Sequence, residues 1–380
     1  MPVDVSLISS FSVNGLRKAI EFWPTSVCQN CDLYAFMWQD LLDFFPVRSS
    51  STGDGILFGQ RVHRLTAVQA MALAFEEHQE NIVQGKNSPI QEIAFRLADA
   101  FSKKEITIRA IASYIPELTS RSVLCDHDEP VYPERTLGVN ALRFLTILAG
   151  YLQGHKHPVS TIEFVAGSRF SGLGRGKSIE TNEPVIVAPL VRPLASLDDG
   201  EISGLNSPLV KLLLTLAGDI AHDADDKKVR LALELEPGPL NLVNHRNDLV
   251  RIANFLDHPP FSDPARRQTL TALTNVFGFN ADLAHFELAH MSSPSDVPPS
   301  VFKMIRHCHV SEHSLAAFAD LPVSKRRHGG IRAWISKLSE SVDSNSSDYT
   351  FDGFCSVEME AAPSSLAVEK SVRILQSLIR

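Results

Sequence analysis

The chain has 380 residues, of which 44% are hydrophobic and 21% charged, a composition typical of globular proteins and not of disordered or fibrous ones. A formal net charge of -8 argues against a protein that grips the backbone of a nucleic acid. The sequence has no apolar run long enough to span a membrane, and Met1–Val5 lacks the features of a secretory signal. Five cysteines are too few, and odd in number, for a disulfide framework, so we expect a cytoplasmic protein.

The first 150 residues contain recognisable elements at irregular intervals. Val3–Ser9 predicts an opening strand, and Arg121–Cys125 is compatible with a later one, in which case His127 would enter a site at its end. Cys28 and Cys31 form a C-x-x-C pair without a second pair at zinc-finger spacing, so we interpret them as ordinary thiols in a loop or helix. The predicted helices are Leu16–Phe22, Leu65–Glu77, Ile90–Phe101 and Leu137–Leu152.

The remainder of the chain alternates short apolar runs with amphipathic helical stretches. The predicted strands are Thr161–Val165, Val229–Leu235, Phe279–Leu283, Arg306–Ser311 and Gly353–Glu358, with Val185–Val191 as a further extended piece. The predicted helices are Ser207–Ala221, Asp248–Leu256, Pro264–Phe277 (ended by Gly278), Ser300–Ile305, Gly330–Glu340 and Ser364–Ile379. This alternation, with strands that are apolar on both faces, indicates an α/β fold with a parallel sheet.

Polar side chains capable of binding a metal stand at the C-terminal ends of four of these strands. The sets are Glu234 with Glu236, Asp282 with His285, His307 with His309, and Glu358 with Glu360. Residues two apart on a strand share one face, so the members of the first and third sets point the same way. Burying an unpaired carboxylate costs several kcal/mol, and four such costs in one sheet need a common compensation. A divalent cation offers it, and a buried network of ion pairs is the alternative.

Together these segments resemble the xylose-isomerase-like TIM barrels, the superfamily of sugar isomerases, sugar epimerases and apurinic endonucleases. The matching segments are LALELEPGPL (Leu231–Leu240), GFNADLAHFELA (Gly278–Ala289), IRHCHVSEH (Ile305–His313) and FCSVEMEAA (Phe354–Ala362), in the order of the fifth to eighth strands. TIEFVAGSRFSG (Thr161–Gly172) fits the fourth strand. The resemblance covers roughly residues 155–380 and, as a set, is specific for the superfamily rather than for one activity.

The resemblance implies one (β/α)₈ TIM-like barrel over residues 1–380, with a helical insertion or distorted early barrel units at residues 40–120. It also implies a divalent metal, for which oxygen-rich ligation with one imidazole suits Mn²⁺ or Mg²⁺ best, while Zn²⁺ and Co²⁺ also fit. The implied metal ligands are Glu234, Asp282, His309 and Glu358, and the implied substrate-binding or supporting residues are His285, Glu236 and His307. As partners we expect a small carbohydrate, no membrane and no nucleic acid, and homo-oligomerisation is left open.

The function that the resemblance implies is a metal-dependent isomerase or epimerase acting on a ketose through an enediolate, with Glu234 and Glu358 as the acid/base pair. A metal-dependent phosphodiesterase like the apurinic endonucleases is the first alternative. It is disfavoured because Leu321-Pro322 follows Asp320, where that class has an Asp-x-His. A non-catalytic, metabolite-binding accessory protein is the second alternative, because the first 150 residues match the superfamily poorly beyond the opening strand.

Overall fold

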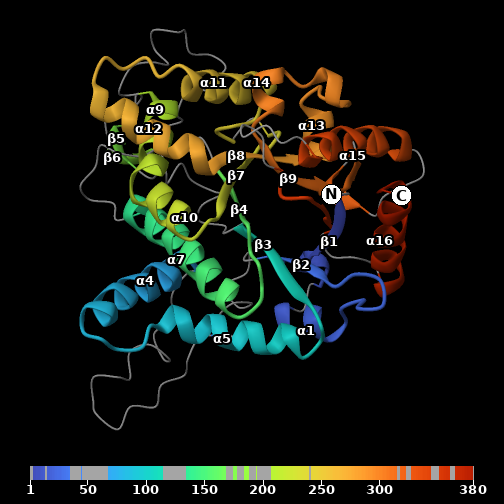
Figure 1. Ribbon diagram of the computed structural model, residues 1–380. Helices are drawn as coiled ribbons and strands as arrows, with labels where there is room; N and C mark the ends of the chain where they lie inside the picture. The colour runs from blue at the N-terminus through green and yellow to red at the C-terminus, as the bar shows by residue number, and fades with distance from the viewer. Residues whose placement is uncertain are drawn as a thin grey trace.

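Eight parallel strands close into one barrel in the computed structural model, which confirms the predicted (β/α)₈ architecture (Figure 1). The structure describes residues 3–12, 15–34, 44, 67–113, 134–167, 174–177, 184–187, 194, 207–238, 241–314, 317–321, 327–343, 351–359 and 364–379. The barrel strands are β1 (Asp4–Ile8), β2 (Asn30–Tyr34), β3 (Thr107–Ser113), β4 (Thr161–Val165), β7 (Arg230–Glu234), β8 (Phe277–Asp282), β9 (Ile305–Val310) and β12 (Phe354–Val357). Each strand pairs with its neighbour in chain order, and β12 closes the barrel against β1.

Helices surround the barrel (Figure 1). They are α1 (Leu16–Glu21), α4 (Ala67–Val83), α5 (Pro89–Ser102), α7 (Glu134–Gly154), α9 (Pro208–Thr215), α10 (Ala221–Asp226), α11 (Arg246–Asp257), α12 (Pro264–Val276), α13 (Leu283–Leu288), α14 (Pro299–Phe302), α15 (His328–Asp343) and α16 (Ser365–Ile379). The local sequence explains where two of these helices begin. The side chains of Ser88 and Asp263 cap α5 and α12, and the first residue of each helix is proline. Within the described ranges, no helix has both the length and the apolar character needed to cross a bilayer.

The five strands predicted as such after residue 150 are barrel strands, and two early barrel strands were not predicted. The third strand is Thr107–Ser113, not Arg121–Cys125, which lies outside the described residues. Both missed strands carry a charged residue in a short apolar run, Asp32 in NCDLY and Arg109 in TIRAIAS, so neither shows a clear strand pattern. The extent of the domain, residues 1–380 with an insertion over 40–120, stays a prediction.

Two further expectations need correction. Gly278 lies inside β8 rather than ending the preceding helix, which stops at Val276. The piece predicted at Val185–Val191 is β6 (Pro184–Val187), which pairs antiparallel with β5 (Gly174–Lys177) outside the barrel. A second antiparallel pair, β10 (Glu312–Ser314) with β11 (Ala317–Leu321), follows β9. Both hairpins are inserted after barrel strands, where local pairing replaces the parallel pattern.

Both members of the cysteine pair are buried in the core, Cys28 in a loop as expected and Cys31 in a strand rather than in a loop or helix. Cys31 belongs to β2, and Cys28 precedes that strand. Both thiols are buried and free, and burial raises the pKa of Cys28 to about 12. A thiol with so high a pKa stays protonated near neutral pH, so these residues pack as small apolar side chains.

Candidate metal centre

Four side chains from the last four barrel strands converge at the C-terminal end of the barrel. Glu234 and Asp282 are the last residues of β7 and β8, His309 is the next-to-last residue of β9, and Glu358 directly follows β12. One donor atom from each lies within 4.8 Å of those of the other three. All four residues are buried, with at most 3% of the surface of any of them exposed. The structure therefore brings together the four residues that the sequence singled out as ligands.

Hydrogen bonds hold these four side chains in place. The Asn280 amide nitrogen donates to Glu234 Oε2 at 2.8 Å and lies 3.1 Å from His309 Nδ1. The carboxylate of Asp282 accepts from the backbone N–H of His285 at 2.7 Å, which caps the start of α13. Nδ1 of His309 lies 2.9 Å from Glu358 Oε2. Contacts from neighbouring strands and from the start of α13 thus hold these side chains in place.

The chemistry of this donor set fits a divalent cation. Three carboxylates and one imidazole are confined in a buried space, where like charges repel strongly and hydration is lost. Carboxylate oxygens with one imidazole are ligands that Mn²⁺, Mg²⁺ and Zn²⁺ all accept, so the residues alone do not select the ion. Burial and the arrangement of the donors together support a divalent metal here.

His285 and Glu236 form a second group with Glu234 beside the metal centre. Nδ1 of His285 lies 3.0 Å from Glu234 Oε1, and Glu236 is half-buried. Burial alone would lower the pKa of His285, but the carboxylates of Asp282, Glu234 and Glu236 reverse this and raise the pKa well above its usual value. A cationic imidazole can therefore stand beside Glu234 when no metal is bound.

His307 lies one layer below the metal centre, deep in the barrel. It is fully buried, and its Nε2 lies 2.9 Å from Asp32 Oδ2 and 3.1 Å from Glu163 Oε1. Its Nδ1 contacts Asp352. Burial lowers the pKa of His307, and the carboxylates of Asp352, Glu163 and Asp32 more than compensate, so that the pKa lies well above its usual value. This position leaves His307 without direct access to the mouth of the barrel.

Glu163 and Asp32 are two buried site residues that the sequence did not single out. The Glu163 carboxylate lies between both histidines: Oε2 is 2.6 Å from His309 Nε2, and Oε1 faces His307. Asp32 accepts a hydrogen bond from Ser6 Oγ at 2.7 Å and another from Ser356 Oγ. Burial by itself raises the pKa of Asp32, but His307, Ser356 and His309 together lower it by more, so the pKa lies below its usual value. The sequence signal that could have identified both residues is an acid in the middle of an otherwise apolar strand.

The mouth of the barrel has a second, apolar half. Ile8, Tyr34, Ala112 and Val165, one from each of the first four barrel strands, form a buried apolar cluster separate from the main core. Ile8, Tyr34 and Val165 each stand two residues beyond an interior polar residue (Ser6, Asp32 and Glu163), so they face the interior as well. We call this cluster the apolar wall. It belongs to the strands opposite those that carry the metal-centre residues.

Two residues that the sequence placed near a site, His127 and Glu360, lie outside the described residues. Their expected roles stay predictions.

No family model matches the chain, and no curated protein matches it in sequence. Solved structures do match. One is a D-tagatose 3-epimerase-like protein, 13% identical with a TM-score of 0.53, with 99% of this chain and 96% of that chain covered. Another is a xylose isomerase domain protein from Planctomyces limnophilus, 11% identical with a TM-score of 0.50, with 100% of this chain and 98% of that chain covered. The resemblance to xylose-isomerase-like barrels is thereby confirmed at the level of fold.

Proposed function

We propose that this protein is a metal-dependent isomerase or epimerase that moves a proton on a ketose or a related sugar-derived hydroxy-ketone. The observation that carries the proposal is the convergence of Glu234 and Glu358, from strands separated by β8 and β9, on the same buried group as Asp282 and His309. Two carboxylates at a candidate cation site supply both a base and an acid for the same substrate carbon. The fold of the matching epimerase-like and isomerase-domain structures accords with this interpretation.

Each residue of the centre has a proposed task. Asp282 and His309 would hold the cation together with Glu234 and Glu358, and Mn²⁺ or Mg²⁺ is our first expectation. When bound, a divalent cation polarises the carbonyl and the adjacent hydroxyl of a ketose and so acidifies the carbon-bound proton next to the carbonyl. One glutamate then takes that proton, and the other returns a proton to the same or the neighbouring carbon.

The apolar wall supports a carbohydrate of small size as the substrate. Small-molecule sites combine apolar walls with a few placed polar groups, and this mouth has both kinds of surface on opposite strands. Tyr34 offers an aromatic side chain against which the C–H face of a sugar can pack. The polar half would receive the carbonyl and hydroxyl oxygens.

We predict that His285→Ala raises KM more than it lowers kcat. The imidazole of His285 reaches Glu234 but lies at the edge of the group, with 9% of its surface exposed, so we assign it to holding a substrate oxygen. Steady-state kinetics on the substrate found in the screen below measures both constants. A fall in kcat with unchanged KM would instead make His285 part of the proton transfer.

We predict that Glu163→Met weakens metal binding by about 10–100-fold, the usual effect of removing a carboxylate that orients a metal-binding histidine. Glu163 faces Nε2 of His309 and thereby leaves Nδ1 directed at the metal centre. Glu163→Gln keeps an oxygen that can accept a hydrogen bond from Nε2–H of His309, so its metal affinity should fall less than that of Glu163→Met. Competition with a chelator gives the affinities. Equal affinity in wild type and Glu163→Met would show that Glu163 is not needed to orient the ring.

A screen for products tests the proposed function. Metal-loaded and metal-free protein would be incubated with a panel of ketoses and their phosphates, and products would be separated by chromatography. We expect an epimer or isomer to appear only with metal. Cleavage of abasic DNA by the same preparation would favour a phosphodiesterase, and full metal occupancy without any product would favour an accessory protein.

A further inference from the structure

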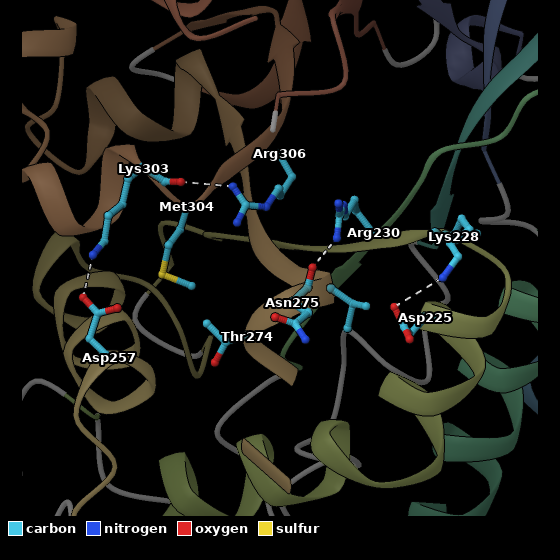
Figure 2. Close-up of a pocket in the computed structure, with 12 residues that line it drawn as sticks. Asp225, Lys228, Arg230, Asp257, Thr274, Asn275, Lys303, Met304 and Arg306 are labelled. Carbon is cyan, nitrogen blue, oxygen red and sulfur yellow. Dashed lines mark hydrogen bonds and ion pairs between the residues drawn. The ribbon is translucent and has the colours of Figure 1, made fainter. Parts of the chain in front are cut away.

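A cavity of about 730 Å³ lies at the opposite end of the barrel from the metal centre (Figure 2). Its lining comes from the starts of strands β7 and β9, the residues just before β8, and the ends of α10, α11 and α12. Arg230 at the start of β7 lines it, whereas Glu234 at the end of the same strand belongs to the metal centre. Four residue steps of a strand put these ends about 13 Å apart along the barrel. The two sites are therefore distinct.

The lining of this cavity is positively charged, although the chain as a whole is negative. Lys228, Arg230, Lys303 and Arg306 line it, against Asp225 and Asp257, so four cations minus two anions leave a surplus of two positive charges. The formal net charge of the whole chain is -8. A concave basic surface concentrates the field of its charges and attracts small anions.

The lysines and the arginines of the cavity are held differently, as the dashed lines in Figure 2 show. Lys303 Nζ pairs with Asp257 at 2.7 Å, and Lys228 Nζ lies 3.8 Å from Asp225. Arg306 Nη1 donates to the Lys303 carbonyl at 3.0 Å. Arg230 Nη1 donates to the carbonyl of Asn275. Each guanidinium has five N–H donors in a planar arrangement, and these bonds to backbone carbonyls hold both arginines at the cavity.

Two features of the backbone direct Arg306 to this cavity. Phe279 pairs with Ile305 and Asn280 with His307, so Arg306 is the extra residue of a bulge between β8 and β9. Bulges re-aim a side chain, and they recur beside functional sites. Next to it, a Cβ on Gly278 would lie 2.2 Å from Cγ of Arg306 and 2.3 Å from the Met304 carbonyl oxygen. Glycine at 278 therefore makes room for the arginine, of which only 7% is exposed.

We propose that this cavity binds a phosphate-bearing small molecule. Guanidinium groups match phosphate oxygens with paired N–H donors, and two of them line the same cavity. The volume lies within the range of roughly 300–1,000 Å³ that small-molecule sites occupy. The site is separate from the proposed reaction centre and does not depend on the activity assigned there.

Titration calorimetry of the metal-loaded protein with inorganic pyrophosphate tests this proposal. We expect saturable binding of one pyrophosphate per chain, weakened at least about tenfold in Arg306→Met and in Arg230→Gln, since each removes a charged donor. Arg306→Lys keeps the positive charge but loses the planar pair of N–H donors, so its affinity for pyrophosphate should lie between those of wild type and Arg306→Met. Lys337→Gln on α15 removes an exposed positive charge that does not line the cavity, so this variant should bind pyrophosphate like wild type.

Two further variants test whether pyrophosphate binds in this cavity rather than at the metal centre. Asp282→Ala, altered at the metal centre, should bind pyrophosphate like wild type, because the cavity lies at the other end of the barrel. Arg230 is partly exposed, so Arg230→Gln keeps the test valid if Arg306→Met melts at a lower temperature. Absence of binding at millimolar pyrophosphate, wild-type binding in both arginine variants, or loss of binding in Asp282→Ala would overturn the proposal.

Discussion

Replacing Asp282 by alanine should strip the divalent metal from the purified protein. The Asp282 carboxylate is fully buried, and it lies within 4.8 Å of the donor atoms of Glu234, His309 and Glu358. Its removal takes away one of three anionic ligands. Elemental analysis should show bound metal falling from about one per chain to about a tenth of that or less, since even supporting residues change affinity 10–100-fold.

Asp282→Asn provides the matched control for folding. The Asp282 carboxylate also caps α13 by accepting from His285 N–H, and losing such a cap costs about 1 kcal/mol. Asparagine keeps the cap but removes the charge, so Asp282→Asn should lose metal while melting near the wild-type temperature. Asp99→Ala, in an exposed pair on α5, should keep its metal. Metal retained in both Asp282 variants would contradict the assigned ligand set.

Glu358→Gln should slow proton exchange on the substrate by about 10²–10⁴-fold, the usual contribution of one general acid–base group. Glu358 is buried in the metal centre and contacts His309. Glu236→Gln is the matched variant, because it makes the same chemical change on a half-buried glutamate beside the centre, and it should cost clearly less. Incorporation of deuterium from D₂O, followed by NMR, gives both rates.

Metal content must be measured in the same Glu358→Gln samples, because Glu358 is also a candidate ligand. A rate that falls in proportion to bound metal would assign Glu358 to holding the cation rather than to proton transfer. A rate that falls while the metal remains bound would assign Glu358 to proton transfer. Equal losses in Glu358→Gln and Glu236→Gln would remove the distinction on which the acid/base assignment rests.

The four residues of the candidate metal centre could be singled out from the sequence, because they stand at or near the ends of apolar strands. Glu234, Asp282 and Glu358 each stand at or just beyond the end of a strand, where barrels place their sites, and a spacing of two residues linked His309 to His307. These signals are local, so they can be recognised without knowing how the chain closes. The same signals placed β7, β8, β9 and β12 in the right order.

Asp32 and Glu163, which both contact His307 below the metal centre, could not be singled out in this way, because their contacts join distant segments of the chain. Asp32 and His307 are 275 residues apart in the chain and meet only because the barrel closes. Asp32 also made its own strand, β2, hard to predict, because an acid inside NCDLY interrupts the apolar pattern of a buried strand. Glu163 lies in the middle of a correctly predicted strand, away from the strand ends that mark the other site residues. Both acids occupy positions where the strand pattern favours an apolar residue, and such departures are common near functional sites.

Deuterium incorporation by the wild-type protein is the decisive measurement for the proposed function, because it reports proton removal from carbon even when no new sugar accumulates. The metal-loaded protein would be incubated in D₂O with a panel of ketoses and hydroxy-ketones, and the proton next to the carbonyl would be followed by NMR. We expect this signal to disappear for at least one substrate and to persist once the metal has been chelated. Full metal occupancy with every signal unchanged across the panel would contradict the proposed proton transfer.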